Sequence, residues 1–92
     1  MEEVIILATV IQVQKRDGRL EDWDRGKVLN GVVKAGLSSE EAGGVGALIE
    51  GWAVRNAQND VIKSDDVRNK VLEILRAVYP GAASNFEAYK RS

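Results

Sequence analysis

VQKRDGRLEDWDRGK, residues 13–27, contains five of the chain's thirteen lysines and arginines. The dipeptide Asp17-Gly18 lies among these cations and is typical of a two-residue hairpin turn of type I′, in which both central residues have positive φ. The turn therefore predicts that a strand ending near Arg16 pairs with a returning strand over residues 19–23.

The pairing in such a hairpin decides which side chains share a face of the sheet. With a two-residue turn, Lys15 pairs with Leu20 and Gln14 pairs with Glu21. Because successive side chains of a strand point to opposite faces, Lys15 and Glu21 are expected on opposite faces. One ligand then touches both only if it lies along the sheet edge or if a bulge rotates one of the two residues.

The segment before the turn is rich in valine, isoleucine and threonine, which favours a strand over residues 4–15. This strand is longer than its partner and needs another neighbour: either a third strand formed by a bend near Ala8-Thr9, or a strand of another chain. The apolar run over residues 4–10 follows two acids and is too short for a membrane span or a secretory signal. We therefore expect a cytoplasmic protein with no membrane partner.

Downstream of the hairpin, apolar residues recur at helical spacing. Asp24 is a suitable N-cap for a first helix, and Ser38 with Glu41 forms a capping box for a second. Ser64 is expected to cap a third helix, which ends before Pro80. The predicted helices cover residues 25–35, 39–57, 65–78 and 82–90.

Strands followed by helices indicate an α+β fold. We expect a small antiparallel hairpin or three-stranded cap over residues 4–23, followed by a four-helix bundle, in a single domain of residues 1–92. The chain has no cysteine and no histidine, which excludes disulfides, thiolate metal centres and imidazole catalysis. Its net charge of −1 argues against nucleic acid as a partner, because proteins that bind DNA broadly usually carry a basic excess.

The cations around Asp17-Gly18 have two interpretations. They can form a solvated hairpin tip that discourages edge pairing, with nearby acids as their partners. They can instead form a polyphosphate site, because Lys27 falls in the first turn of the first helix, where unpaired N–H groups also attract anions. Acids in the same window are Asp17, Glu21, Asp22 and Asp24.

The ordered pattern VxKRDGxxExxDxxKxxxxxxxAG, which begins at Val13, resembles the opening of the ATP-cone domain. This regulatory module is found in many ribonucleotide reductases and in the repressor of their genes. The resemblance covers nearly the whole chain: residues 62–67 are similar to the segment that opens the third helix, and residues 89–91 to the closing aromatic–Arg segment. It implies a small β-cap over a four-helix bundle, with a nucleotide site between them.

The resemblance also implies roles for individual residues. Lys15, Arg16 and Lys27 are expected to contact phosphates, Glu21 to accept a hydrogen bond from the base or ribose, and Val13 to contact the adenine. The full set that the resemblance implies as nucleotide-binding is Val13, Lys15, Arg16, Glu21, Asp24, Lys27, Ser64, Arg68 and Arg91.

The remaining members of this set lie on the helices and at the C-terminus. Asp24 is expected to cap the first helix beside the phosphates, Ser64 and Arg68 to face the site from the third helix, and Arg91, with Lys90, to close it. Trp23 has two interpretations: a hydrophobic staple at the start of the first helix, or a stacking partner for adenine.

We therefore expect a non-catalytic regulatory module that binds ATP or dATP together with Mg²⁺. Binding is expected to favour one packing of cap on bundle and so to alter assembly with a copy of itself or control of a larger regulated protein. The alternative is a ligand-free interaction or oligomerisation domain that pairs through its apolar first strand. An enzyme such as a small ATPase is not expected, because the chain has no Walker motif and no evident general base.

Overall fold

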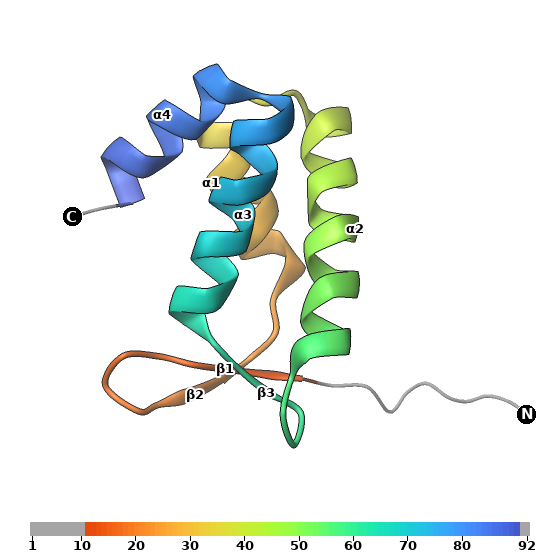
Figure 1. Cartoon of the computed structure of the whole chain (residues 1–92), viewed down its shortest axis with the longest axis vertical. Coiled ribbons are helices and arrows are strands. Elements are labelled where there is room, and N and C mark those ends of the chain that lie inside the picture. Colours follow the sequence, from red (N-terminus) through yellow and green to blue (C-terminus); the bar gives the residue numbers. More distant parts are fainter. Residues whose placement is uncertain (1–10, 91–92) are drawn as a thin grey trace, which may run out of the picture.

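The strands form one end of the molecule and the helices stand on it, as Figure 1 shows. The computed structural model describes residues 11–90, with the backbone alone at Tyr89 and Lys90. Within that range the elements are β1 (Gln12–Gln14), β2 (Leu20–Asp22), α1 (Arg25–Lys34), α2 (Ser39–Asn56), β3 (Val61–Lys63), α3 (Ser64–Val78) and α4 (Pro80–Lys90). The predicted α+β fold is confirmed.

The described part of the chain contains one three-stranded sheet with the order β2-β1-β3. β1 pairs with β2 in the antiparallel direction and with β3 in the parallel direction. The third strand therefore comes from the segment before α3, and the prediction of a neighbour from residues 4–10 or from another chain was wrong for β1. The predicted strand over residues 4–10 itself lies outside the described residues.

The hairpin turn differs from the predicted two-residue turn. Gly18 donates its backbone N–H to the carbonyl of Lys15 at 2.9 Å, and Lys15 donates to the carbonyl of Arg19 at 2.8 Å. Within this turn only Gly18 has a positive φ, of 91°, so the loop contains three residues and ends in a glycine bulge. Asp17 keeps a negative φ, because its carboxylate accepts the N–H of Arg19 at 3.0 Å and holds the turn.

This longer loop shifts the pairing of the strands by one residue. Val13 now lies opposite Glu21, and Gln14 lies opposite Leu20. Since Lys15 is two residues from Val13, Lys15 and Glu21 lie on the same face of the sheet. The expectation that they lie on opposite faces was wrong, and the bulge is the physical reason.

The helix ends agree with the predicted caps in two cases and differ in two. The carboxylate of Asp24 accepts the N–H of Gly26 at 2.9 Å, and the capping box of Ser38 and Glu41 is complete. Ser64, by contrast, is the first residue of α3 and not its cap, and no side chain caps this helix. Pro80 begins α4, which suits a residue that has no N–H to leave unpaired.

The main core lies where α1, α2, α3 and α4 meet. Val32, Ile49 and Leu75 are fully buried at its centre. A methyl group added at Gly46 would come within 2.8 Å of the side chain of Leu29, so this glycine lets α1 and α2 approach closely. Three residues that the helical spacing places in the core are instead exposed, namely Val33, Leu48 and Val78.

A smaller core joins the sheet to the helices. Ile11, Ala53 and Ile62 are buried there, with Trp52 and Trp23 packed against them. Trp23 packs against the main core as well, which fits its predicted place as a staple at the start of α1. Of the helices in the described range, none combines the length and the apolar character that crossing a bilayer requires.

Candidate functional site

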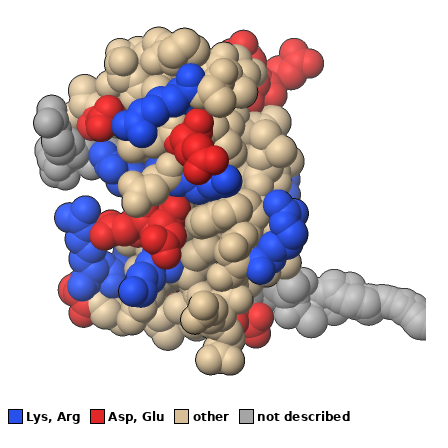
Figure 2. Space-filling view, in the orientation of Figure 1, with Lys and Arg blue, Asp and Glu red and all other residues tan. Residues whose placement is uncertain are grey.

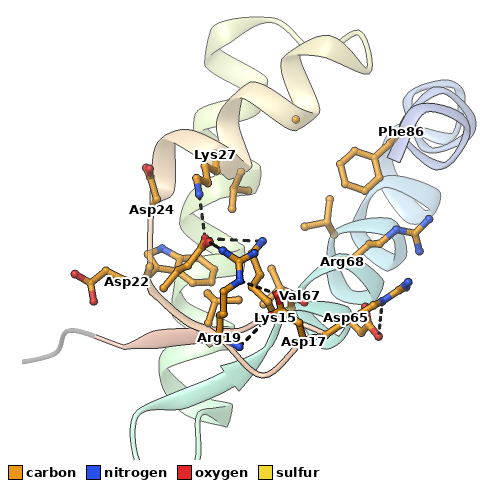
Figure 3. Close-up of a pocket in the computed structure, with 18 of the residues that line it drawn as sticks. Lys15, Asp17, Arg19, Asp22, Asp24, Lys27, Asp65, Val67, Arg68 and Phe86 are labelled. Atoms are coloured by element: carbon orange, nitrogen blue, oxygen red, sulfur yellow. Dashed lines mark hydrogen bonds and ion pairs between the residues drawn. The ribbon is translucent and has the colours of Figure 1, made fainter. Parts of the chain in front are cut away.

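A cavity of about 840 Å³ lies between the hairpin and the helices α1, α3 and α4. Its volume is within the range of roughly 300–1,000 Å³ that small-molecule sites occupy. Figure 3 shows residues of the hairpin and α1 on one side of this space and residues of α3 and α4 on the other.

Basic side chains reach the cavity from three different elements. Lys15, Arg16 and Arg19 come from the hairpin, Lys27 from the first turn of α1, and Arg68 from α3. Several cations that converge from separate elements are what a polyphosphate requires, because its charge is spread over several oxygens. Of these five cations, Lys15, Arg16, Lys27 and Arg68 belong to the set that the resemblance implied, whereas Arg19 does not.

Glu21 is the centre of the ion pairs on the hairpin side. Its Oε1 lies 3.1 Å from Lys27 Nζ and 3.9 Å from Lys15 Nζ, and its Oε2 lies 3.8 Å from an Arg19 nitrogen. The hydrogen bond from Lys27 lowers the pKa of the Glu21 carboxyl below its ordinary value of 4.5, with the charges of all three cations adding to the effect. Three positively charged side chains therefore converge on the position that the Glu21 carboxylate occupies.

The remaining hairpin cations are also paired. Arg19 Nε lies 2.7 Å from Asp17 Oδ2, and the backbone and side-chain hydrogen bonds from Arg19 lower the pKa of Asp17. Arg16 Nε lies 3.0 Å from Asp65 Oδ1, which links the hairpin to α3. Arg68 is the one lining cation for which no ion pair forms among the residues that the structure describes.

Acidic side chains in the cavity wall balance the cations. Figure 2 shows basic and acidic groups interspersed over one face of the molecule, without a continuous basic patch on that face. No group of three or more acidic side chains within residues 11–90 is arranged to hold a metal ion. The carboxylates that line the cavity are Asp17, Glu21, Asp22, Asp24, Asp65 and Glu87.

The cavity also has an apolar part. Phe86 of α4 is buried and lines it, as do Trp23 and Val13 of β1. The indole Nε1 of Trp23 is buried and has no hydrogen-bond partner in the described structure. An adenine ring needs apolar contact area and aromatic faces, which these side chains supply. The apolar lining consists of Val13, Trp23, Val28, Val67, Val71 and Phe86.

Most of the residues that the sequence pointed to are brought together here. Eight of them line this one cavity: Val13, Lys15, Arg16, Glu21, Asp24, Lys27, Ser64 and Arg68. The side chain of Lys90 and the whole of Arg91 lie outside the described residues. The contacts of each residue with a nucleotide stay predictions.

Eleven of the lining residues were not part of the predicted set, among them Phe86, Glu87 and Asp65. Phe86 and Glu87 reach the cavity only because α4 folds back along α3 and α1, which no local pattern shows. Asp65 lies beside the predicted Ser64, but its sequence context indicates only an acid placed favourably in a first helical turn.

A family comparison agrees with this geometry. The family model of the ATP cone domain matches residues 11–92. The chain belongs to the ATP-cone domain family. The ATP-cone domain is a regulatory nucleotide-binding module, and the resemblance drawn from the sequence is therefore confirmed.

The chain is also similar to a curated protein, the transcriptional repressor NrdR of Petrotoga mobilis (strain DSM 10674 / SJ95). The two are 34% identical over an alignment of 74 residues, and the match covers 76% of this chain and 49% of that protein. This ATP-cone chain thus spans about half the length of the curated relative that it matches.

Proposed function

We propose that this chain binds ATP or dATP in the cavity between the β-cap and the helices, and that binding regulates its assembly or a partner. The observation that carries the proposal is the convergence of basic side chains from the hairpin, α1 and α3 on a cavity whose other part is apolar. Triphosphate and adenine need these two environments side by side. Membership of the ATP-cone family supports the same ligand class.

The phosphates are proposed to lie near the present position of the Glu21 carboxylate. Lys15 and Lys27 already point at that group, at 3.9 and 3.1 Å from its Oε1. A bound phosphate takes over these cations, and Glu21 then becomes available to accept a hydrogen bond from the ribose or the adenine. Ser64 and the N–H groups of the uncapped α3 N-terminus add donors on the opposite side.

The adenine is proposed to occupy the apolar part of the cavity. Val13 lies on the same face as Lys15 and Glu21, so a nucleotide along β1 meets an apolar residue beside the cationic ones. Trp23 and Phe86 add aromatic surface. Mg²⁺ is proposed to arrive with the nucleotide, held by phosphate oxygens and water, and to offset the carboxylates of the cavity wall.

The proposed role is regulatory and not catalytic. The cavity joins the β-cap to three helices, so a ligand that bridges them favours one packing of cap on bundle. Such a bias controls assembly with a second copy or with a larger regulated protein. The similarity to a protein named as a transcriptional repressor supports a role in control.

Calorimetric titration with ATP and with dATP, each with Mg²⁺, tests the proposal. Lys15→Gln should weaken binding by roughly tenfold or more, because a charge-assisted contact to phosphate is lost. Lys34→Gln is the matched control, since Lys34 is exposed at the far end of α1 and does not line the cavity. A folded sample that shows no binding at millimolar nucleotide would contradict the proposal.

A further inference from the structure

One ion pair joins the tip of the hairpin to the first turn of α3. Arg16 Nε lies 3.0 Å from Asp65 Oδ1 and 3.3 Å from Asp65 Oδ2, although the residues are 49 positions apart in the chain. Both side chains are more than half exposed, at 81% and 52%, and both line the cavity. A ligand in the cavity can therefore reach the guanidinium and the carboxylate alike.

Asp65 occupies a position that suits a phosphate. It lies in the first turn of α3, a 15-residue helix whose N-terminus has no side-chain cap. Free N–H groups and the helix dipole attract an anion there, and Arg16 supplies a cation. The Asp65 carboxylate accepts the Nε–H of Arg16 and offsets its single positive charge. A phosphate oxygen at this guanidinium therefore competes with Asp65 for that donor and for that charge.

We propose that Asp65 is an internal competitor for the phosphates at Arg16, and that its carboxylate sets the affinity of the cavity for a nucleotide triphosphate. This inference rests on the proposed function. Binding exchanges the Arg16–Asp65 pair for an Arg16–phosphate pair. The net gain in binding free energy at Arg16 is therefore smaller than an unpaired arginine provides. The affinity for the triphosphate is lower than the same cations would give without Asp65.

Two other carboxylates of the cavity wall, Asp17 and Glu21, act differently. Asp17 holds the hairpin turn through the N–H of Arg19, so it belongs to the same loop as the cation that it pairs with. Glu21 faces three cations and is itself expected to contact the ligand. Asp65 alone among these three reaches the hairpin from a helix.

The exchange also links binding to the packing of the cap. Among the described residues, the pair of Arg16 and Asp65 is the one ion pair between the hairpin and α3. When a phosphate replaces Asp65, the hairpin tip loses this direct connection and is joined to α3 through the ligand. The presence of a triphosphate therefore changes the connection between cap and bundle.

The test compares ATP affinity in variants that isolate this pair. Asp65→Asn should bind ATP roughly twofold to fivefold more tightly, the range that loss of one exposed ion-pair competitor permits. The gain should disappear when Arg16→Gln is also present. Adenosine, which carries no phosphate, should bind the wild type and the Asp65→Asn variant equally. Asp66→Asn is the matched control, because Asp66 also lies in the first turn of α3 but does not line this cavity.

The outcomes distinguish the competitor role of Asp65 from the proposed nucleotide site. Asp66→Asn loses the same favourable charge at the helix N-terminus, so an equal change in unfolding temperature shows that any gain in Asp65→Asn is not a folding effect. If Asp65→Asn binds ATP no better than Asp66→Asn, or keeps its gain without Arg16, the competitor role is overturned and the nucleotide site stands. If the folded wild-type chain binds no ATP, both proposals are overturned.

Discussion

Lys15 Nζ lies 3.9 Å from Glu21 Oε1 because the hairpin loop contains three residues and not two. The bulge at Gly18 moves the partner of Val13 to Glu21, which puts both charged side chains on the cavity face of the sheet. The geometry of one loop thus decides whether the cations and the acid of this motif act together.

Gly18→Ala should disturb both the fold and the site. At a φ of 91° an L-residue is strained by about 1–2 kcal/mol, so the free energy of unfolding should fall by that amount. ATP affinity should fall as well, since the loop positions Lys15 and Arg16. Urea denaturation and calorimetry measure the two effects.

Gly43→Ala is the control for this substitution. Gly43 lies in α2 with open space around its Cα, so alanine should stabilise the protein by up to about 1 kcal/mol and leave ATP binding unchanged. Equal stability of the Gly18→Ala variant and the wild type would contradict the requirement for a positive φ at position 18.

Glu21 should make stability depend on pH in the acidic range. Its pKa is lower in the fold than its ordinary value of 4.5, mainly through the hydrogen bond from Lys27. Its contribution is therefore complete above pH 4.5 and is lost as the pH falls through the lower folded value, because the unfolded chain binds the proton first. Glu21→Gln should be less stable than wild type at pH 7, and the difference should shrink below pH 4.5.

Urea denaturation at several pH values between 7 and 3 measures this difference. Glu40→Gln is a suitable control, since Glu40 is exposed and forms no ion pair within the described residues. A difference between wild type and Glu21→Gln that stays constant down to pH 3 would show that the cations do not hold the Glu21 carboxylate.

The two tryptophans should report on ligand binding differently. Trp23 lines the cavity, whereas Trp52 lies on the face of α2 beside Lys70. In a Trp52→Phe protein, ATP should change the emission of Trp23, because the ring's surroundings change on binding. In a Trp23→Phe protein, the emission of Trp52 should not respond. A response from Trp52 alone would place the ligand elsewhere.

Asp60→Gly should stabilise the turn before β3. Asn59 and Asp60 have φ values of 54° and 63°, the geometry of a type I′ turn, and Gln58 and Val61 bond across it. Glycine relieves the strain of one such position, so the free energy of unfolding should rise by about 0.5–1 kcal/mol. Asp60→Ala should lower it, and ATP affinity should be unchanged in both. A denaturant titration in which the Asp60→Ala variant is more stable than the Asp60→Gly variant would contradict the backbone strain at Asp60.

Nucleotide should change the assembly state of the chain if the proposed regulation is correct. Sedimentation velocity with and without ATP or dATP should show a shift in the sedimentation coefficient, because the ligand favours one packing of cap on bundle. Lys15→Gln should not shift at the same nucleotide concentration, and Lys34→Gln should behave as wild type. Tight binding without any shift would direct the search to a separate partner protein.

Much of the candidate site follows from the sequence, because its residues lie in an ordered local motif. Lys15, Arg16, Glu21 and Lys27 are within a single stretch. The resemblance of that ordered stretch to the opening of the ATP-cone domain implied a shared site. Their actual contacts depended on the loop, whose type the Asp17-Gly18 dipeptide did not decide. Asp-Gly is compatible with a two-residue loop and with a three-residue loop. The strand pairing and the hydrogen bonds of the Asp17 side chain select the three-residue loop here.

The sequence by itself determined the helices and two of their caps, because caps and helical spacing depend on residues three or four positions apart. Only the tertiary structure decided that β3 is the third strand, that Phe86 and Asp65 reach the cavity, and that Leu48 and Val78 are exposed. These features join segments far apart in the chain. Their free energy comes from contacts that exist only after the chain has folded, so no local pattern encodes them.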